Sequence, residues 1–144
     1  MRPMSASKRR LYWQLQLAAH FMQKQADRGL VKESGVTTAQ FGVLSAIGNG
    51  SHVTQKDVAT TLGLNQSAIT AMVRRLMEMG YVDRNDSKTD GRTKILSLTS
   101  EGRLICKNTN SPFRKINEQI EATLDDEQID LFADYLEQIT EAFR

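Results

Sequence analysis

The side chains in this sequence that are best suited to chemistry are basic, amide and hydroxyl groups. They gather between residues 66 and 94 and comprise Gln66, Ser67, Thr70, Arg74, Arg75, Lys88, Arg92 and Lys94. Guanidinium and ammonium groups pair with phosphate oxygens, while short hydroxyl and amide groups can bond phosphates or base edges. The set is therefore compatible with contact to a nucleic acid.

Residue types that build enzyme sites are scarce. The chain has two histidines, His20 and His52, and one cysteine, Cys106. It has neither a glycine-rich phosphate loop nor the Cys/His spacing of a metal site. We therefore expect no catalytic residue, no metal and no cofactor, and we interpret Cys106 as a small helix residue.

Charge varies along the chain, although the net charge is +2. Residues 1–35 hold seven Lys/Arg and two Asp/Glu, whereas residues 113–144 hold three and nine. The segment 51–103 holds eight and six, a mild excess that permits nucleic-acid binding. The acidic end argues against a protein that coats DNA with its whole surface.

Nothing in the sequence predicts a membrane partner. No apolar run approaches the roughly 18 residues that a membrane span needs. The basic N-terminus is not followed by the apolar core of a signal peptide. The expected location is the cytoplasm.

The elements that must position the polar cluster are mostly helices. Residues 6 to about 28 are rich in helix formers, and Gly29 and Gly35 bracket an expected break. Thr37 begins a capping-box pattern, so a second helix should start there and end near residues 49–50.

The cluster itself starts in a pair of short helices. Thr54 and Asp57 form another capping pattern, and Asn65 can cap the next helix. Gly63 suits the left-handed end of the first helix. Two short helices joined by so tight a turn are typical of a helix-turn-helix.

The helix expected at 65–79 has two unlike faces. Its apolar stripe comprises Ile69, Met72, Val73 and Leu76. Its outward face comprises Ser67, Thr70, Ala71 and Arg74, with plain solvation of the two hydroxyls as the alternative. Arg75 points to the flank of the helix, so a salt bridge inside the protein is a strong alternative to a nucleic-acid contact.

A hairpin should follow this helix. The runs "YVDRN" and "TKILSL" predict two short strands around a polar loop, which holds Lys88 at its tip and Arg92 on its descending edge. Thr99 or Ser100 should then cap a helix. This order of elements is that of a winged helix-turn-helix, although a solvated loop without function is the alternative for the hairpin tip.

The C-terminal third should be helical, with a break between Asn108 and Pro112 and a capping box from Asp125 to Gln128. The apolar stripe of the first part comprises Phe113, Ile116, Ile120 and Leu124. The apolar face of the last helix comprises Phe132, Tyr135, Leu136, Ile139 and Phe143. These are too many large apolar residues for a lone exposed helix, which favours a homodimer.

The segments "GVTTAQFGVLSAI", "TQKDVATTLGLNQSAITAMVRRLMEMGYVDR" and "DGRTKILSLTSEG" resemble the MarR family of bacterial transcription regulators. The resemblance implies a mainly α fold with a small β-hairpin wing. It implies one domain over 1–144, with a DNA-binding lobe at about 36–98 and dimerisation helices at about 5–30 and 99–144. It also implies a sequence-specific repressor whose interleaved homodimer binds a pseudo-palindromic site on double-stranded DNA.

The resemblance further implies that Asp90 orients Arg92 or a neighbouring Arg through a charge-assisted bond. Two positions depart from the family pattern. Ala71 stands where Arg is frequent, with Arg74 one turn along, and Gly91 replaces the second cation of a frequent Asp-Arg-Arg. Both departures affect which operator sequence is expected more than how the protein is expected to dock on DNA. A winged helix that binds proteins rather than DNA is the competing interpretation.

Family members commonly bind small aromatic or phenolic effectors, or sense oxidants. Tyr12, Trp13 and His20 could line an effector pocket. Interface or core packing for Trp13, and a solvated or satisfied helix position for His20, are the favoured interpretations. Thiol sensors of the family carry a cysteine in the first helix. This chain has none there, so we expect no peroxide sensing by Cys106.

Overall fold

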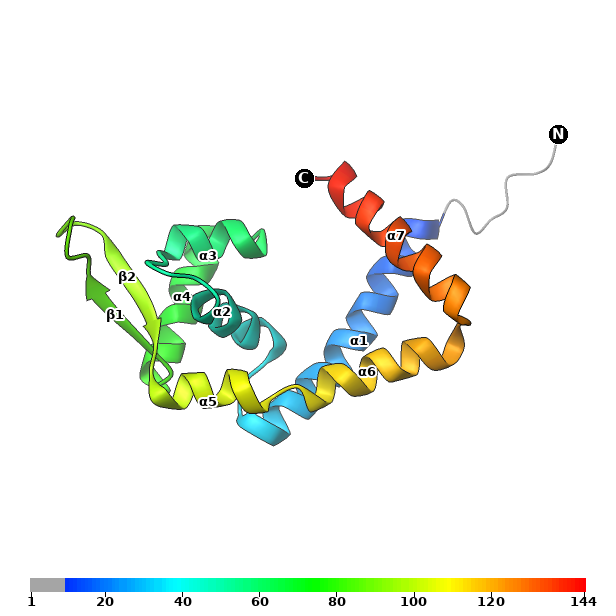
Figure 1. Cartoon of the computed structure of the whole chain (residues 1–144), viewed down its shortest axis with the longest axis horizontal. Helices are drawn as coiled ribbons and strands as arrows, with labels where there is room; N and C mark the ends of the chain where they lie inside the picture. The colour runs from blue at the N-terminus through cyan, green and yellow to red at the C-terminus, as the bar shows by residue number, and fades with distance from the viewer. Residues whose placement is uncertain (1–9) are drawn as a thin grey trace. The chain divides into compact units, whose positions relative to one another are not determined.

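The structure is a computed structural model that describes residues 10–144. The chain divides into two compact units, one ending at Asn110 and the other spanning Ser111–Arg144 (Figure 1). The helix expected from residue 6 and the dimerisation segment expected from residue 5 therefore begin outside the described residues. Across residues 10–144, none of the helices is long and apolar enough to cross a membrane.

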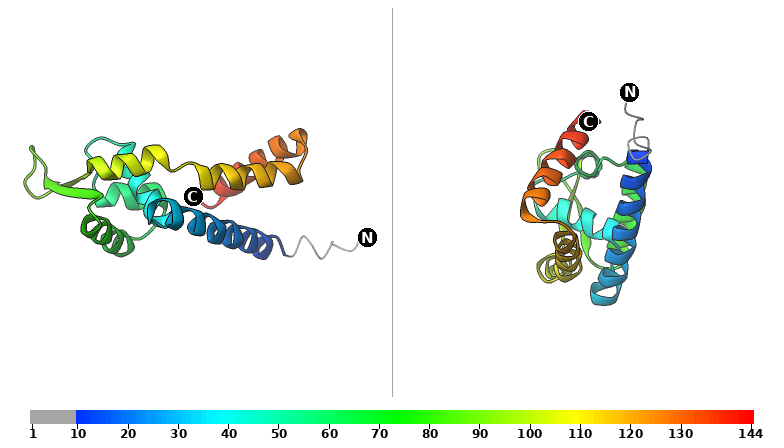
Figure 2. Two further views of the ribbon diagram at one scale, coloured as in Figure 1. Left: turned by 90° about the horizontal axis from the view of Figure 1, so that it is seen from below. Right: turned by 90° about the vertical axis from the view of Figure 1, so that its right-hand side faces the viewer.

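The first unit has the predicted order of elements (Figures 1 and 2). They are α1 (Leu11–Ser34), α2 (Thr38–Gly48), α3 (Gln55–Leu62), α4 (Gln66–Glu78), β1 (Val82–Asp86), β2 (Lys94–Leu98) and α5 (Ser100–Asn108). The two strands form an antiparallel sheet. The prediction of a mainly α, winged helix-turn-helix fold is confirmed.

Helix α1 does not break at Gly29, so that prediction was wrong. The helix continues to Ser34 and ends at Gly35, whose φ of 74° is left-handed. A glycine inside a helix costs about 1 kcal/mol relative to alanine. Ala26 and Leu30, which flank Gly29, are buried, and their packing outweighs that cost.

Asp27 ties α1 to the start of α2. Its carboxylate accepts a hydrogen bond from the backbone N–H of Thr38 at 2.6 Å and another from the Thr38 hydroxyl. A carboxylate at this position satisfies a free donor and interacts favourably with the helix dipole. The contact holds the two helices together at the edge of the lobe.

Local capping fixes the helix-turn-helix as predicted. Thr37 and Thr54 each begin a capping box, in which side chain and backbone exchange hydrogen bonds with the residue three positions on. The Asn65 side chain accepts from the N–H of Ala68 and so caps α4. Gly63 ends α3 with a φ of 65°. The turn between α3 and α4 is therefore set by contacts local in sequence.

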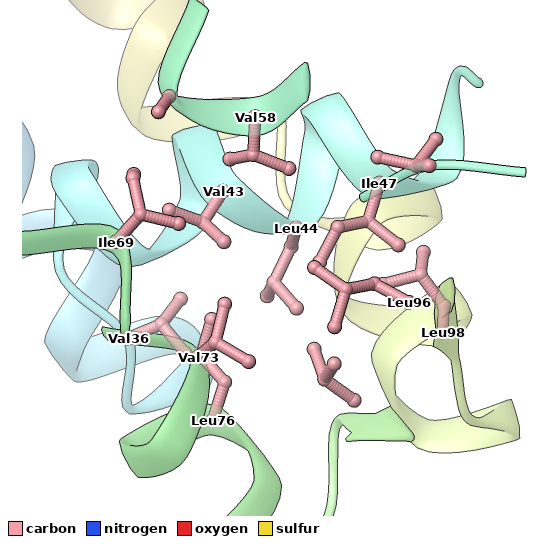
Figure 3. Close-up of a cluster of buried hydrophobic side chains, with 13 residues drawn as sticks. Val36, Val43, Leu44, Ile47, Val58, Ile69, Val73, Leu76, Leu96 and Leu98 are labelled. Carbon is pink, nitrogen blue, oxygen red and sulfur yellow. The ribbon is translucent and has the colours of Figure 1, made fainter. Parts of the chain in front are cut away.

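A single apolar cluster holds these elements together (Figure 3). It contains Val36, Val43, Leu44, Ile47, Val53, Val58, Ala59, Ile69, Val73, Leu76, Val82, Leu96 and Leu98. Ile69, Val73 and Leu76 of the predicted α4 stripe are buried, while Met72 packs at the margin. Burying this face of α4 leaves the opposite face in solvent.

The hairpin is anchored at its base and exposed toward its tip. Val82 pairs with Leu98 inside the core, whereas Asp86 pairs with Lys94 in solvent. The edge of β2 that faces away from β1 is bonded to the segment before α3. There the Leu96 N–H donates to the Val53 carbonyl at 2.8 Å. Figure 1 shows the tip extending away from α2 and α3.

The base of the hairpin meets α5 in a close contact. The Thr99 hydroxyl donates to the carbonyl of Gly80 at 2.7 Å and accepts from the N–H of Gly102 at 3.1 Å. The Thr99 N–H donates to the Tyr81 carbonyl at 3.1 Å. A Cβ at Gly102 would lie 2.2 Å from that carbonyl oxygen. The Leu98-Thr99-x-x-Gly102 pattern therefore has a structural role here.

The second unit contains α6 (Ser111–Thr123) and α7 (Asp126–Ala142). The interruption predicted near Pro112 is present, since α5 ends at Asn108 and α6 begins at Ser111. The predicted capping box between Asp125 and Gln128 starts α7. A hollow of about 360 Å³ lies at this end of α7, lined by Leu124, Gln128, Leu131, Phe132 and Tyr135.

Candidate nucleic-acid interface

The N-terminal end of α4 presents the predicted polar side chains to solvent. Gln66 and Ser67 are exposed, and Thr70 is half-buried. The Ser67 hydroxyl bonds Asn65 Oδ1 at 2.8 Å, and the Thr70 hydroxyl bonds the Gln66 carbonyl at 2.8 Å. The two hydroxyls are thus held in fixed positions before any partner arrives.

Gln55 also lies beside the N-terminal end of α4, a position that the sequence did not predict. Its Nε2 lies 3.4 Å from Thr70 Oγ1, so the first turn of α3 contributes to the polar surface of α4. In a helix-turn-helix the start of the first helix stands close to the second. The position just after the Thr54 cap was therefore the available signal.

Arg74 and Arg75 have different environments although both are exposed. Arg75 Nη1 lies 3.5 Å from Glu78 Oε2, three residues on along α4. Arg74 takes part in none of the salt bridges among the described residues. The alternative of an internal salt bridge is therefore realised by Arg75, and Arg74 is the stronger candidate for a contact.

Asp90 organises the wing loop and bonds Arg92 through the backbone rather than through the guanidinium. Its carboxylate accepts from the backbone N–H of Arg92 at 3.0 Å and from the hydroxyl of Thr93 at 2.9 Å. The bond from the Arg92 N–H, followed by that from the Thr93 hydroxyl, lowers the pKa of Asp90 below its ordinary value. Neither bond involves a guanidinium, so Asp90 shapes the loop backbone and leaves the Arg92 side chain without a carboxylate partner.

In the hairpin, as in α4, one basic residue forms a salt bridge and others do not. Lys94 forms a cross-strand salt bridge with Asp86. Lys88 and Arg92 are exposed and form none of the salt bridges found in residues 10–144. Because β1 packs on α4, the wing and the outward face of α4 belong to one lobe. That lobe presents Arg74, Lys88 and Arg92 as exposed, uncompensated cations.

The candidate effector residues lie on the exposed surface of α1. Tyr12 and Trp13 are 63% and 69% exposed, and their rings meet edge to face with centroids 5.0 Å apart. His20 is exposed and contacts Phe21. Trp13 is therefore not part of the apolar core of the first unit. The apolar hollow of the second unit is lined by other residues.

Cys106 is half-buried on α5 and packs against the lobe core. Burial raises the pKa of its thiol above the ordinary value, although a hydrogen bond with Ser45 acts in the opposite direction. A raised pKa means less thiolate, which is the reactive form. This environment supports the expectation that Cys106 does not sense peroxide.

We expect Cys106 to alkylate slowly in the native protein. At pH 7 its iodoacetamide reaction should be slower than that of a free thiol, and the rate should keep rising above about pH 8.5, where an ordinary thiol is half ionised. Mass spectrometry across pH 6–10 measures this, with the unfolded chain in denaturant as control. A native rate at neutral pH above that of the unfolded chain would contradict it.

The chain resembles known transcription regulators over most of its length. A model of the MarR family matches residues 34–93. The HTH-type transcriptional regulator YwoH of Bacillus subtilis is 28% identical over 130 residues, which are 90% of this chain and 93% of YwoH. Several relatives from Bacillus species are 37% identical over 78 residues, and this chain spans about half, 51%, of their length.

Solved structures show the same fold. The S. aureus MepR–DNA complex superposes with a TM-score of 0.84 at 19% identity, covering 92% of this chain and 97% of MepR. PcaV of Streptomyces coelicolor, solved with its natural ligand, gives 0.78 at 25% identity over 100% and 99% of the two chains. The family and these relatives are regulators and not enzymes, in agreement with the sequence prediction. Residues 34–93 of this chain therefore match the MarR family of DNA-binding transcription regulators, and the chain shares the winged helix-turn-helix fold of solved MarR-family structures.

Proposed function

We propose that this regulator is a cytoplasmic, homodimeric repressor that binds a pseudo-palindromic operator and is released by a small aromatic or phenolic effector. The observation that supports the DNA-binding surface is that one lobe presents the exposed cations Arg74, Lys88 and Arg92, which form no salt bridge within the described residues, together with the hydroxyls of α4. Cations whose charge is already paired gain less from a phosphate. The proposal therefore ranks these three above Arg75 and Lys94.

Each lobe would place α4 in a major groove and the wing beside it in a minor groove. An arginine inserted into a narrow minor groove gains from the enhanced negative potential there. Arg92, on an exposed loop, suits that role. In a two-fold dimer the half-sites would lie about one DNA turn, roughly 10 bp, apart.

The dimer is supported by the apolar surface of the single chain. Large apolar side chains exposed on α7 are Leu131, Phe132, Tyr135, Leu136 and Ile139, and the exposed Phe143 follows its last residue. Leu11, Tyr12, Trp13, Leu17 and Phe21 are exposed on α1. Contiguous apolar patches of this kind mark interaction sites on soluble proteins. Sedimentation at micromolar concentration should give a dimer, and a folded monomer there would contradict the proposal.

An effector is supported by the ligand-bound PcaV neighbour and by the aromatic side chains of α1. Trp13 is the one tryptophan in the sequence, so its fluorescence reports directly on that surface. Salicylate and 4-hydroxybenzoate are suitable probes. The effector part of the proposal requires that one such compound both perturbs Trp13 emission and lowers the affinity for DNA.

The DNA-binding part is tested by fluorescence anisotropy. The full chain is titrated against the DNA upstream of its own gene and against random duplex DNA of equal length at several salt concentrations. We expect preferential binding and a linear loss of log affinity with log salt, because counterions are released from neutralised phosphates. No preference and no salt dependence would instead favour the protein-binding alternative.

The Gly91→Arg variant should bind DNA more tightly. Gly91 is exposed, has no positive φ, and no atom lies within 4 Å of a Cβ built there, so the wing can carry a larger side chain. One added phosphate contact should steepen the salt dependence by about 0.9 in the slope of log affinity against log salt. Anisotropy measures both quantities, with Gly91→Ala as the uncharged control. An unchanged slope in Gly91→Arg would place residue 91 away from the phosphates.

A further inference from the structure

The hydroxyl of Ser67 has a defined hydrogen-bond direction. Asn65 Oδ1 accepts from the backbone N–H of Ala68 at 2.8 Å, so the atom facing the helix must be the amide oxygen. Ser67 Oγ lies 2.8 Å from the same oxygen. Since that oxygen can only accept, the proton between them belongs to Ser67.

The hydroxyl of Thr70 is fixed in the same way. Its Oγ1 lies 2.8 Å from the carbonyl oxygen of Gln66, which also can only accept. The Thr70 proton is therefore donated into α4, a common arrangement for threonine in helices. Gln55, at 3.4 Å from Thr70 Oγ1, must then offer its N–H and take up one of the two lone pairs.

Each hydroxyl has one proton and two acceptor positions. In both side chains the proton is committed within the protein, and at least one lone pair remains for a partner. Phosphate oxygens have no proton at neutral pH to donate, so these hydroxyls cannot bond them without breaking an internal hydrogen bond. In the major groove the base groups that donate are adenine N6 and cytosine N4.

We propose that Ser67 and Thr70 act as hydrogen-bond acceptors that select base pairs whose major-groove amino group, adenine N6 or cytosine N4, lies on the strand facing them, and that they do not contact phosphates. This inference rests on the proposed DNA binding and adds which bases this part of α4 selects. Arg74, Lys88 and Arg92 would then contact the phosphates. The oxygen lone pairs of Ser67 and Thr70 would select the bases at the start of α4.

The test begins with selection of binding sites from random duplexes by the wild-type chain and by Thr70→Val, which keeps the shape of the side chain and removes the acceptor. At one position of each half-site the wild type should accept adenine or cytosine on one defined strand and reject guanine and thymine on that strand. Thr70→Val should lose that preference by roughly 5- to 100-fold, the range of one specific base contact. Thr70→Ser, which keeps the hydroxyl, should retain it.

A chemical probe separates the amino group from the rest of the base. In the selected site, the chosen adenine or cytosine is replaced by the corresponding base that lacks its exocyclic amino group. Wild-type affinity should fall as it does in Thr70→Val, and Thr70→Val should lose nothing further. Affinity for random DNA and its salt dependence should be the same in the wild type, Thr70→Val and Ser67→Ala.

Other outcomes overturn the inference in distinguishable ways. A Thr70→Val variant that binds all sequences equally more weakly indicates a hydroxyl that donates to phosphate. One that binds as the wild type does, or a wild-type affinity that is unchanged when the amino group of the selected base is removed, removes the acceptor role. If the wild type selects no sequence at all, the proposed function fails, and this inference fails with it.

Discussion

Replacing Gly102 by alanine should destabilise the DNA-binding lobe more than any other exchange at a glycine of the wing and its base. A Cβ there would lie 2.2 Å from the backbone carbonyl oxygen of Tyr81. That carbonyl also accepts from the Thr99 N–H, so it is held by the hydrogen bonds that join the hairpin to α5. Forcing the two segments apart should lower the free energy of unfolding by about 1–3 kcal/mol, the usual range for overpacking.

The measurement is urea denaturation of wild type and Gly102→Ala at equal protein concentration, followed by circular dichroism. Gly91→Ala is the matched control, because a Cβ at Gly91 meets no atom within 4 Å. The control should stay within about 0.5 kcal/mol of wild type. Equal stability of Gly102→Ala and Gly91→Ala would show that the contact between Gly102 and Tyr81 relaxes freely.

Replacing Arg92 by alanine should cause the largest loss of DNA affinity among the basic residues of the wing. Its guanidinium has no carboxylate partner within the described residues, whereas Lys94 is paired with Asp86. A lost charge-assisted hydrogen bond is worth about 1.5–3 kcal/mol, so affinity should fall about 10- to 100-fold. The loss should be nearly uniform across sequences, and the salt slope should fall by about 1.

Lys94→Ala is the control for Arg92→Ala, since it removes a cation from the same hairpin. Its effect on anisotropy titrations should be clearly smaller, because the Lys94 charge is already compensated by a neighbour. Both side chains are exposed, so neither change should alter the thermal midpoint by more than a few degrees. Equal losses in the two variants would mean that net charge alone matters, and no loss in Arg92→Ala would remove the wing from the binding surface.

Elements defined by neighbours in sequence were predictable. The capping boxes at Thr37, Thr54 and Asp125 and the left-handed end at Gly63 are all present, because each depends on residues within one helical turn. The break expected at Gly29 is absent, because the buried residues beside it contact parts of the chain that a local pattern does not contain. Local rules fail where tertiary packing opposes them.

The candidate interface was predictable in composition but not in its electrostatics. The sequence identifies the basic residues of α4 and the wing, yet it treats Lys94 and Arg92 alike. Their difference arises from strand register, which places Lys94 opposite Asp86. The hydrogen bonds of Asp90 likewise depend on the path of the loop backbone, so a bond to a backbone N–H could not be distinguished from one to a guanidinium.

The strand β1 has a further consequence, which concerns association between molecules. In the part of the chain that the structure describes, β2 bonds to partners on both edges, while β1 bonds to β2 alone. An exposed strand edge is a template for pairing with another chain. Four consecutive exposed polar residues, Asp83, Arg84, Asn85 and Asp86, occupy that edge. Their charges disfavour sheet extension, so the wing can remain accessible without promoting aggregation.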